Sequence, residues 1–302
     1  MDPHDAFEKI MEEMRMHVAG KKETIELLFI CLISNGHALL EGVPGVAKTT
    51  TSKTLAAVIE ADFKRIQGTP DLEPRDITGY TYVDDDGNVK FNKGPVFTNV
   101  LLIDEINRMQ PKTMSALLET LEERQVSVGG ESTPLPAPFT SFATQNPLNI
   151  EGTVALPKVL ADRFLMKIDV GYPTIEEEKE MIRLKEKGGH TTVNKVMSIN
   201  DVLEMQEKVD SVELPDDVID YIAKIINATR KDIHVVMGAS PRADMAFMRT
   251  AKAKALIEGR SAVTIDDIKA LAKPVLGHRI VVRASGGIGV NGIIDGIVAT
   301  LK

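Results

Sequence analysis

The spacing of apolar residues divides the chain into two parts with different predicted structures. In the first part, short apolar runs typical of buried strands alternate with segments whose apolar positions recur at helical spacing. The predicted strands cover residues 38–40, 63–67, 100–103, 139–144 and 165–170, and the predicted helices cover 7–17, 23–34, 48–59 and 111–123. This alternation predicts an α/β domain with a parallel sheet over residues 1–172.

From Tyr172 onward, β-prone runs mostly disappear. Thr174 and Glu177 form a predicted capping box at the start of a helix. Further helices are predicted at residues 199–209, 215–229, 241–258, 265–276 and 293–301. Residues 173–302 are therefore predicted to form a second, all-helical domain.

Composition narrows the class of protein. The 302 residues carry a net charge of -8, which disfavours non-specific attraction to nucleic acid. The one cysteine, Cys31, excludes disulfides within the chain and favours a reducing compartment. Its apolar run, residues 27–33, is far shorter than a membrane span, and the acidic amino terminus does not resemble a signal region. We therefore expect a cytoplasmic protein with no membrane span.

The stretch His37–Thr50 combines a strand, a glycine loop and a helix. Gly42 and Gly45 allow the backbone to turn its N–H groups toward a phosphate, and the helix N-terminus adds a favourable dipole. Lys48 would reach the β- and γ-phosphates, and the Thr49 hydroxyl would ligate Mg²⁺. Ala47 stands where a last glycine is expected, and we expect it to adopt ordinary helical angles. The predicted loop residues are Gly42, Val43, Pro44, Gly45, Val46, Ala47, Lys48, Thr49 and Thr50. The alternative is a helix-capping turn with a chance lysine.

Two acids follow the apolar run Val100–Ile103, which predicts a strand buried on both faces. At the carboxyl edge of a parallel sheet, Asp104 would hold Mg²⁺ and Glu105 would polarise a water for attack on a γ-phosphate. The alternative is that both acids merely begin a helix. Asn146 follows another strand and would orient the water or sense the γ-phosphate, unless it only forms a turn before proline.

Exposed turns and isolated basic residues are weaker evidence for functional sites. The acidic run Asp84–Asp86 next to Gly87 predicts a solvated hairpin turn rather than a calcium loop, and Gly129-Gly130 predicts a second exposed turn. His278 and Arg279 are expected to be surface or subunit-contact groups rather than metal ligands. Arg163 is either a surface arginine at a helix end or a cation presented across a subunit boundary.

Several motifs in order along the chain are similar to those of the MoxR group of AAA+ ATPases. They are Gly-Val-Pro-Gly-Val-Ala-Lys-Thr at 42–49, Leu-Leu-Ile-Asp-Glu-Ile-Asn-Arg at 101–108, Ala-Thr-Gln-Asn-Pro at 143–147, Asp-Arg-Phe at 162–164 and Gly-Ala-Ser-Pro-Arg-Ala at 238–243. The resemblance implies an AAA+ P-loop three-layer αβα domain with a parallel sheet, followed by a small all-α lid domain. The two hairpins then resemble the insertions typical of this clade.

The resemblance also implies roles for individual residues. Asn146 matches the first sensor, and Arg163 matches an arginine finger presented to the neighbouring subunit. Arg242 matches the second sensor, which would reach from the lid to the γ-phosphate. Val18, Ala19 and Gly20 match the segment that lines the adenine pocket. The implied cofactors are ATP and Mg²⁺.

The leading functional hypothesis is ATP hydrolysis in a homo-oligomeric ring that remodels, assembles or matures a client protein complex. In similar proteins the ring is usually hexameric and works with a von Willebrand factor A domain partner. A nucleotide-gated binding scaffold is the first alternative, although Glu105 argues against it. A DNA-remodelling AAA+ motor is the second, and the acidic charge makes nucleic acid an improbable partner.

Overall fold

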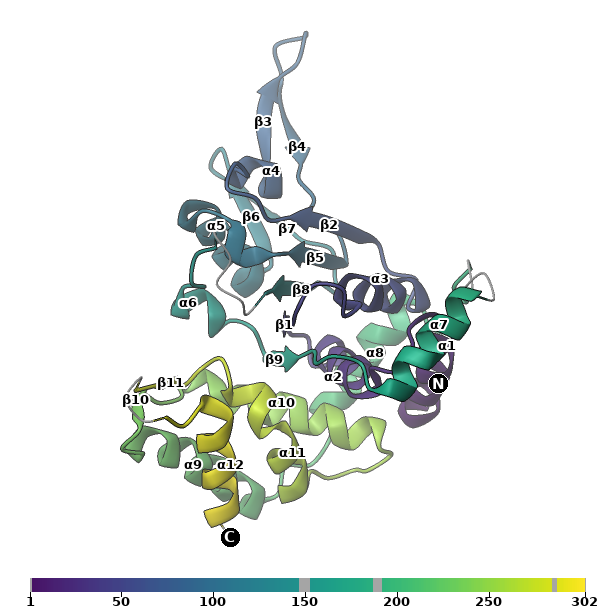
Figure 1. Cartoon of the computed structure of the whole chain (residues 1–302). Helices are drawn as coiled ribbons and strands as arrows, with labels where there is room; N and C mark the ends of the chain where they lie inside the picture. Colours follow the sequence, from purple (N-terminus) through teal and green to yellow (C-terminus); the bar gives the residue numbers. More distant parts are fainter. Residues whose placement is uncertain (1, 147–152, 187–191, 284–286, 302) are drawn as a thin grey trace.

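A five-stranded parallel sheet forms the centre of the amino-terminal domain (Figure 1). The structure is a computed structural model that describes residues 2–146, 153–186, 192–283 and 287–301. The strands lie in the order β2-β5-β8-β1-β9, so the two strands with the strongest sequence signals, β1 and β5, flank β8. Their bounds are β1 Ala38–Glu41, β2 Phe63–Gln67, β5 Val100–Asp104, β8 Thr140–Gln145 and β9 Met166–Asp169.

Helices cover both faces of this sheet, because successive strand residues point to opposite sides. Leu40 and Leu102 belong to the hydrophobic cluster that contains the amino-terminal helices, whereas Leu39 and Leu101 belong to the other cluster. The first face carries α1 Pro3–His17, α2 Lys22–Ile33 and α3 Lys48–Val58, and the second carries α5 Pro111–Glu123 with the short elements α4 Pro74–Thr78, η1 Ile106–Arg108 and α6 Lys158–Ala161. The expected three-layer αβα architecture is confirmed.

Two antiparallel hairpins extend from this domain. The hairpin of β3 Gly79–Val83 and β4 Val89–Lys93 projects from the end of the molecule opposite the lid (Figure 1), and β6 Gln125–Val128 pairs with β7 Glu131–Pro134. At the first tip, Asp84 accepts hydrogen bonds from the backbone of Asp86 and Asn88. Across the described part of the chain, no three His, Cys, Asp or Glu side chains gather to hold a metal ion. The acidic run is therefore a hairpin turn.

The carboxy-terminal part is helical, as expected. Its helices are α7 Ile175–Glu186, α8 Ile199–Asp210, α9 Asp216–Lys231, α10 Arg242–Ile257, α11 Ile265–Leu276 and α12 Val290–Thr300. Capping boxes begin α8, with Ser198 and Asp201, and α11, with Thr264 and Asp267. The predicted cap of α7 is present, since Glu177 accepts from Thr174 N and Thr174 Oγ1 accepts from Glu177 N. Sequence analysis missed a small sheet of β10 Val235–Met237 and β11 Val281–Val282, whose runs are very short.

The helical part packs firmly against the amino-terminal helices. Buried residues of α8 to α12 form one continuous hydrophobic cluster with those of α1 and α2. The predicted domain boundary after residue 172 falls in the connection between β9 and α7, and it stays a prediction. Of the helices described, none is both long and apolar enough to span a bilayer.

Candidate nucleotide-binding site

The loop from Gly42 to Ala47 joins β1 to α3 in the predicted strand–loop–helix arrangement. Gly45 has φ +86° and Ala47 has φ +65°, so both residues adopt the left-handed conformation. The expectation of helical angles at Ala47 was wrong. The left-handed turn costs alanine roughly 1–2 kcal/mol, and it lets the loop close directly onto the first turn of α3.

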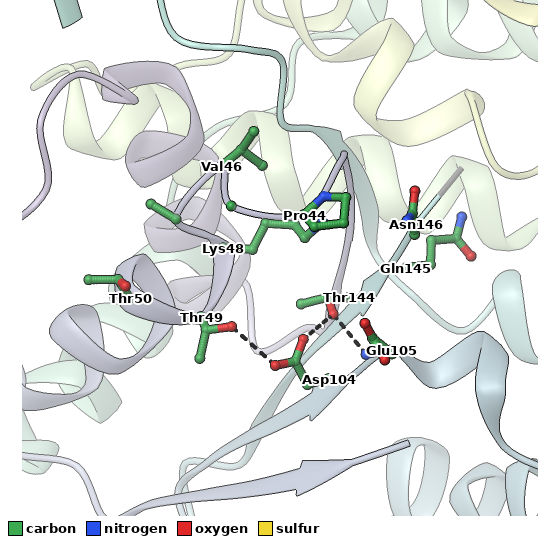
Figure 2. Close-up of a pocket in the computed structure, with 12 residues that line it drawn as sticks. Pro44, Val46, Lys48, Thr49, Thr50, Asp104, Glu105, Thr144, Gln145 and Asn146 are labelled. Carbon is green, nitrogen blue, oxygen red and sulfur yellow. Dashed lines mark hydrogen bonds between the residues drawn. The ribbon is translucent and has the colours of Figure 1, made fainter. Parts of the chain in front are cut away.

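A cavity of about 310 Å³ lies between this loop and the carboxyl ends of β5 and β8 (Figure 2). It is lined by residues 44–50 of the loop and α3, by Asp104 and Glu105 after β5, and by residues 144–146 at the end of β8. The structure therefore brings the phosphate loop, both acids and Asn146 together at one sheet edge. This follows from the strand order, because β1 and β5 both flank β8 and their carboxyl ends meet.

Lys48 lies folded against its own loop. Its Nζ donates to the carbonyl of Gly42 and to that of Val43, the latter at 3.2 Å. Burial lowers the pKa of the lysine, whereas Asp104 and Glu105 act in the opposite direction. The ammonium group thus sits at the cavity wall with two carboxylates nearby, where it can meet a phosphate.

Thr49 and Asp104 meet across the cavity. Thr49 Oγ1 donates to Asp104 Oδ2 at 3.1 Å, as the dashed line in Figure 2 shows. A hydroxyl and a carboxylate oxygen are the hard ligands that Mg²⁺ accepts beside phosphate oxygens. The residues present therefore fit a magnesium ion bound together with a nucleotide.

Sequence analysis missed two residues that hold Asp104 in place. Thr144 Oγ1 donates to Asp104 Oδ1 at 2.6 Å and accepts from Glu105 N at 2.9 Å. Arg65 at the other side pairs with Asp104 Oδ2, with Nη2 at 2.8 Å. Only the strand order could have revealed them, because β5 lies between β2 and β8.

The Glu105 carboxylate is held outside the strand. The residue follows β5 in the left-handed conformation, with φ +55°. Its Oε2 accepts from Arg108 Nη1 at 2.8 Å and from Gln67 Nε2 at 3.2 Å. The predicted water-polarising acid thus lies at the cavity but is engaged by two neighbours, Arg108 of the same motif and Gln67 at the end of β2.

A second, more apolar cavity of about 250 Å³ adjoins the first. It shares Gly45, Val46, Ala47 and Thr50 with the first cavity. It is also lined by Val18 and Ala19 of the predicted adenine segment and by Met181 and Leu184 of α7. Gly20 does not line the cavity. It has φ +64°, and a Cβ there would lie 2.1 Å from Glu177 Oε1, so Gly20 lets α7 approach.

Arg163 and Arg242 line neither of these cavities. Arg163 Nη2 contacts Glu122 Oε2 at 2.5 Å, and Arg242 Nη2 contacts Glu122 Oε1. Arg242 thus lies outside the phosphate-loop cavity of its own chain, and its reach to a γ-phosphate stays a prediction. The cause of this position is the docking of the lid, because Ser240 Oγ beside Arg242 donates to Asp162 Oδ2 at 2.8 Å.

His278 and Arg279 are buried, with 7% and 4% of their surface exposed, so the expectation of surface or contact groups was wrong. Arg279 Nε donates to Asp162 Oδ1 at 3.0 Å, and its Nη2 donates to Phe164 O at 2.8 Å. His278 Nε2 lies 2.9 Å from the same Phe164 carbonyl. Burial lowers the pKa of Arg279 to about 10 against the influence of Asp162. These two residues fasten the lid to the segment that enters β9.

A glycine loop closed by a lysine, a facing hydroxyl–carboxylate pair and a helical lid define a P-loop nucleotide-binding protein. The family model described as "ATPase family associated with various cellular activities (AAA)" matches residues 37–166, and the model for the AAA lid domain matches residues 227–290.

Known proteins resemble the chain over nearly its whole length. It is 42% identical to Chaperone MoxR1 of Mycobacterium tuberculosis, over 91% of this chain and 75% of that protein. It is 40% identical to the uncharacterized protein YeaC of Bacillus subtilis, over 100% of this chain and 96% of that one. The crystal structure of a candidate ATPase from Cytophaga hutchinsonii superposes with a TM-score of 0.91 at 38% identity, covering 99% of this chain and 95% of that one. The chain belongs to the MoxR family of AAA+ ATPases.

Proposed function

We propose that this chain hydrolyses ATP with Mg²⁺. The observation that carries the proposal is the contact of Thr49 Oγ1 with Asp104 Oδ2, 3.1 Å apart, in the cavity that also holds Lys48 and Glu105. A protein that only binds nucleotide has no need of an acid placed beside the metal ligands. Glu105 therefore favours hydrolysis over a nucleotide-gated scaffold.

Each residue then has a defined task. Lys48 and the loop N–H groups bind the β- and γ-phosphates, and Thr49 and Asp104 hold Mg²⁺, which neutralises charge on the phosphates when bound. Glu105 polarises the attacking water, and Asn146 orients that water or senses the γ-phosphate. Val18 and Ala19 line the adenine pocket, and Gly20, which has no side chain, allows α7 to pack beside it.

The site is completed by a second copy of the chain in this proposal. Arg163 and Arg242 lie away from the chain's own phosphate loop, so their guanidinium groups are available to a nucleotide only on a neighbouring subunit. An arginine supplied in this way is worth roughly 10³- to 10⁵-fold in rate. We propose a homo-oligomeric ring, hexameric as in similar proteins.

We propose that the ring uses ATP hydrolysis to remodel another protein. The relative named Chaperone MoxR1 supports a chaperone-like role. The client complex and the von Willebrand factor A domain partner are proposed from the resemblance to the MoxR group. The net charge of -8 speaks against a DNA-remodelling motor. The single cysteine, Cys31, is buried and free, which accords with a cytoplasmic location.

Steady-state ATP hydrolysis across a protein-concentration series, with sedimentation of the same samples, tests this function. We expect specific activity to rise with assembly, and both Glu105→Gln and Arg163→Ala to lose it while Arg163→Ala still binds ATP. Activity that is independent of concentration and insensitive to Arg163 would contradict the shared site. No hydrolysis by the assembled wild type would favour the scaffold.

A further inference from the structure

Glu122 occupies a position where a helix disfavours an acid. It lies in the last turn of α5, and that turn contains no basic residue. The negative end of the helix dipole repels a carboxylate there. The negative charge of Glu122 therefore has to be balanced by positive charge from outside its own helix.

Each oxygen of the Glu122 carboxylate binds a different arginine. Oε2 accepts from Arg163, which follows α6 in the α/β domain, at 2.5 Å, and Oε1 accepts from Arg242 at the start of α10 in the lid. These contacts, with Arg242 first, hold the pKa of Glu122 below its usual value. One carboxylate thus joins two guanidinium groups from different parts of the chain.

The cavity around this carboxylate is strongly cationic. Its volume is about 360 Å³, and Arg124, Arg163, Arg242 and Arg249 line it. Among the described residues that line it, Glu122 is the single carboxylate. Like charges gathered in one cavity repel each other, so the arginines need an anion between them in order to lie together.

Apart from Glu122, the described residues give the two guanidinium groups few close contacts. Arg163 Nη1 donates to Val159 O at 2.6 Å, but its buried Nε has no hydrogen-bond partner. Arg242 comes no closer than 4.0 Å to its second acid, Asp162. The Glu122 carboxylate therefore provides the shared contact that sets one guanidinium relative to the other.

We propose that Glu122 is a positioning residue that holds Arg163 and Arg242 side by side, so that the γ-phosphate on a neighbouring subunit meets both arginines together. This inference rests on the proposed function, in which both arginines act across the subunit boundary. Glu122 touches no nucleotide itself. It acts through the two guanidinium groups and connects α5, which follows the catalytic acids in the chain, with the lid.

Glu122→Gln tests the inference, because glutamine keeps the size of the side chain and removes its charge. The matched control is Glu123→Gln, the next residue, whose carboxylate accepts from Gln125 Nε2 at 3.0 Å. For both variants, kcat and KM for ATP are measured in the assembled protein. The Kd of a fluorescent ATP analogue and the sedimentation profile report separately on the chain's own site and on assembly.

We expect Glu122→Gln to lower kcat by at least ~10-fold, within the coupling typical of residues in direct contact. The Kd of the ATP analogue should stay within about twofold, since Glu122 lies outside the chain's own nucleotide cavities. Glu123→Gln should behave as the wild type. In an Arg163→Ala background, Glu122→Gln should lower kcat much less, because one of its two partners is already gone.

Unchanged or increased kcat in Glu122→Gln, alongside a large loss in Arg163→Ala, would overturn the positioning role and leave the proposed function standing. An equal fold-loss with and without Arg163 would also overturn it, since that indicates a general structural effect. If neither Arg163→Ala nor Arg242→Ala lowers kcat, the shared site itself fails, and this inference fails with it.

Discussion

Thr144→Val isolates one hydroxyl that supports both the predicted metal ligand Asp104 and the predicted water-polarising acid Glu105. The side chain is 1% exposed, and its Oγ1 donates to Asp104 Oδ1 at 2.6 Å while accepting from Glu105 N at 2.9 Å. Valine has nearly the same shape, so the substitution removes both hydrogen bonds while leaving little cavity. The backbone of Glu105, at φ +55°, loses the one side-chain acceptor that fixes its N–H.

The expected magnitude follows from these two bonds. A hydrogen bond to an ionised carboxylate contributes about 1.5–3 kcal/mol, and a buried N–H left without a partner costs about 1–3 kcal/mol. Asp104 keeps Thr49 and Arg65 as partners, which favours the lower half of the sum. We expect the free energy of unfolding to fall by about 2.5–4 kcal/mol.

The effect on activity should exceed the effect of lost stability. A displacement of a catalytic group by about 1 Å can cost ~10²-fold in rate, and Thr144 fixes the residue that carries the Glu105 carboxylate. We expect kcat to fall by about that factor at a temperature where the variant is fully folded. Urea unfolding without nucleotide and steady-state hydrolysis of the same preparation measure the two effects separately.

Thr140→Val is the matched control on the same strand. Thr140 is also 1% exposed, and its Oγ1 donates to Gly36 O at 2.6 Å, far along β8 from the acids. This variant should lose about 1–3 kcal/mol of stability and keep the kcat of the wild type. Equal destabilisation by both substitutions, together with normal kcat in Thr144→Val, would refute the reasoning.

Three further results are expected. Lys48→Ala should weaken ATP binding by at least ~10-fold, because it removes a charged donor to phosphate; an unchanged Kd in a fluorescent-nucleotide titration would contradict this. Burial lowers the pKa of His37 to about 3 and that of His278 well below its usual value. The unfolded chain therefore takes up protons below pH ~6.5 that the native protein does not, and stability should fall as pH drops toward 3, by up to ~1.4 kcal/mol per pH unit for each histidine. A urea midpoint that is flat between pH 7 and 5 would exclude this linkage. Arg279→Ala should cost about 3–5 kcal/mol because the arginine is buried and paired, whereas exposed Arg283→Ala should change stability by no more than about 0.5 kcal/mol; similar unfolding midpoints would count against the fastening role.

Strands β1 and β5 could be predicted from sequence because each has a continuous apolar run that ends at an acid. Residues 63–67 and 111–123 were placed with the bounds that the structure gives. The small β10–β11 sheet could not be predicted, since Val281–Val282 is only two residues long and its partner lies far along the chain. Pairing of that kind is a tertiary property.

The residues proposed to contact nucleotide and metal could be predicted from sequence, whereas the residues that hold them in place could not. Lys48, Thr49, Asp104 and Glu105 stand in local motifs whose chemistry can be inferred from residue type and spacing. Thr144, by contrast, has its role only because β8 lies beside β5. The sequence fixes neither strand order nor the left-handed turn at Ala47, where loop closure overrides the ordinary preference of alanine.

Arg242 shows why a motif does not determine which subunit a residue serves. Its residue type and its place after Ser240-Pro241 match a phosphate sensor, but the docking of α10 decides where the side chain lies. The lid shares a continuous hydrophobic cluster with α1 and α2 and is fastened to Asp162 by buried Arg279. Carrying Arg242 to its own phosphate loop would require breaking these contacts. The cost of breaking them supports the proposal that Arg242 serves a nucleotide on a neighbouring subunit.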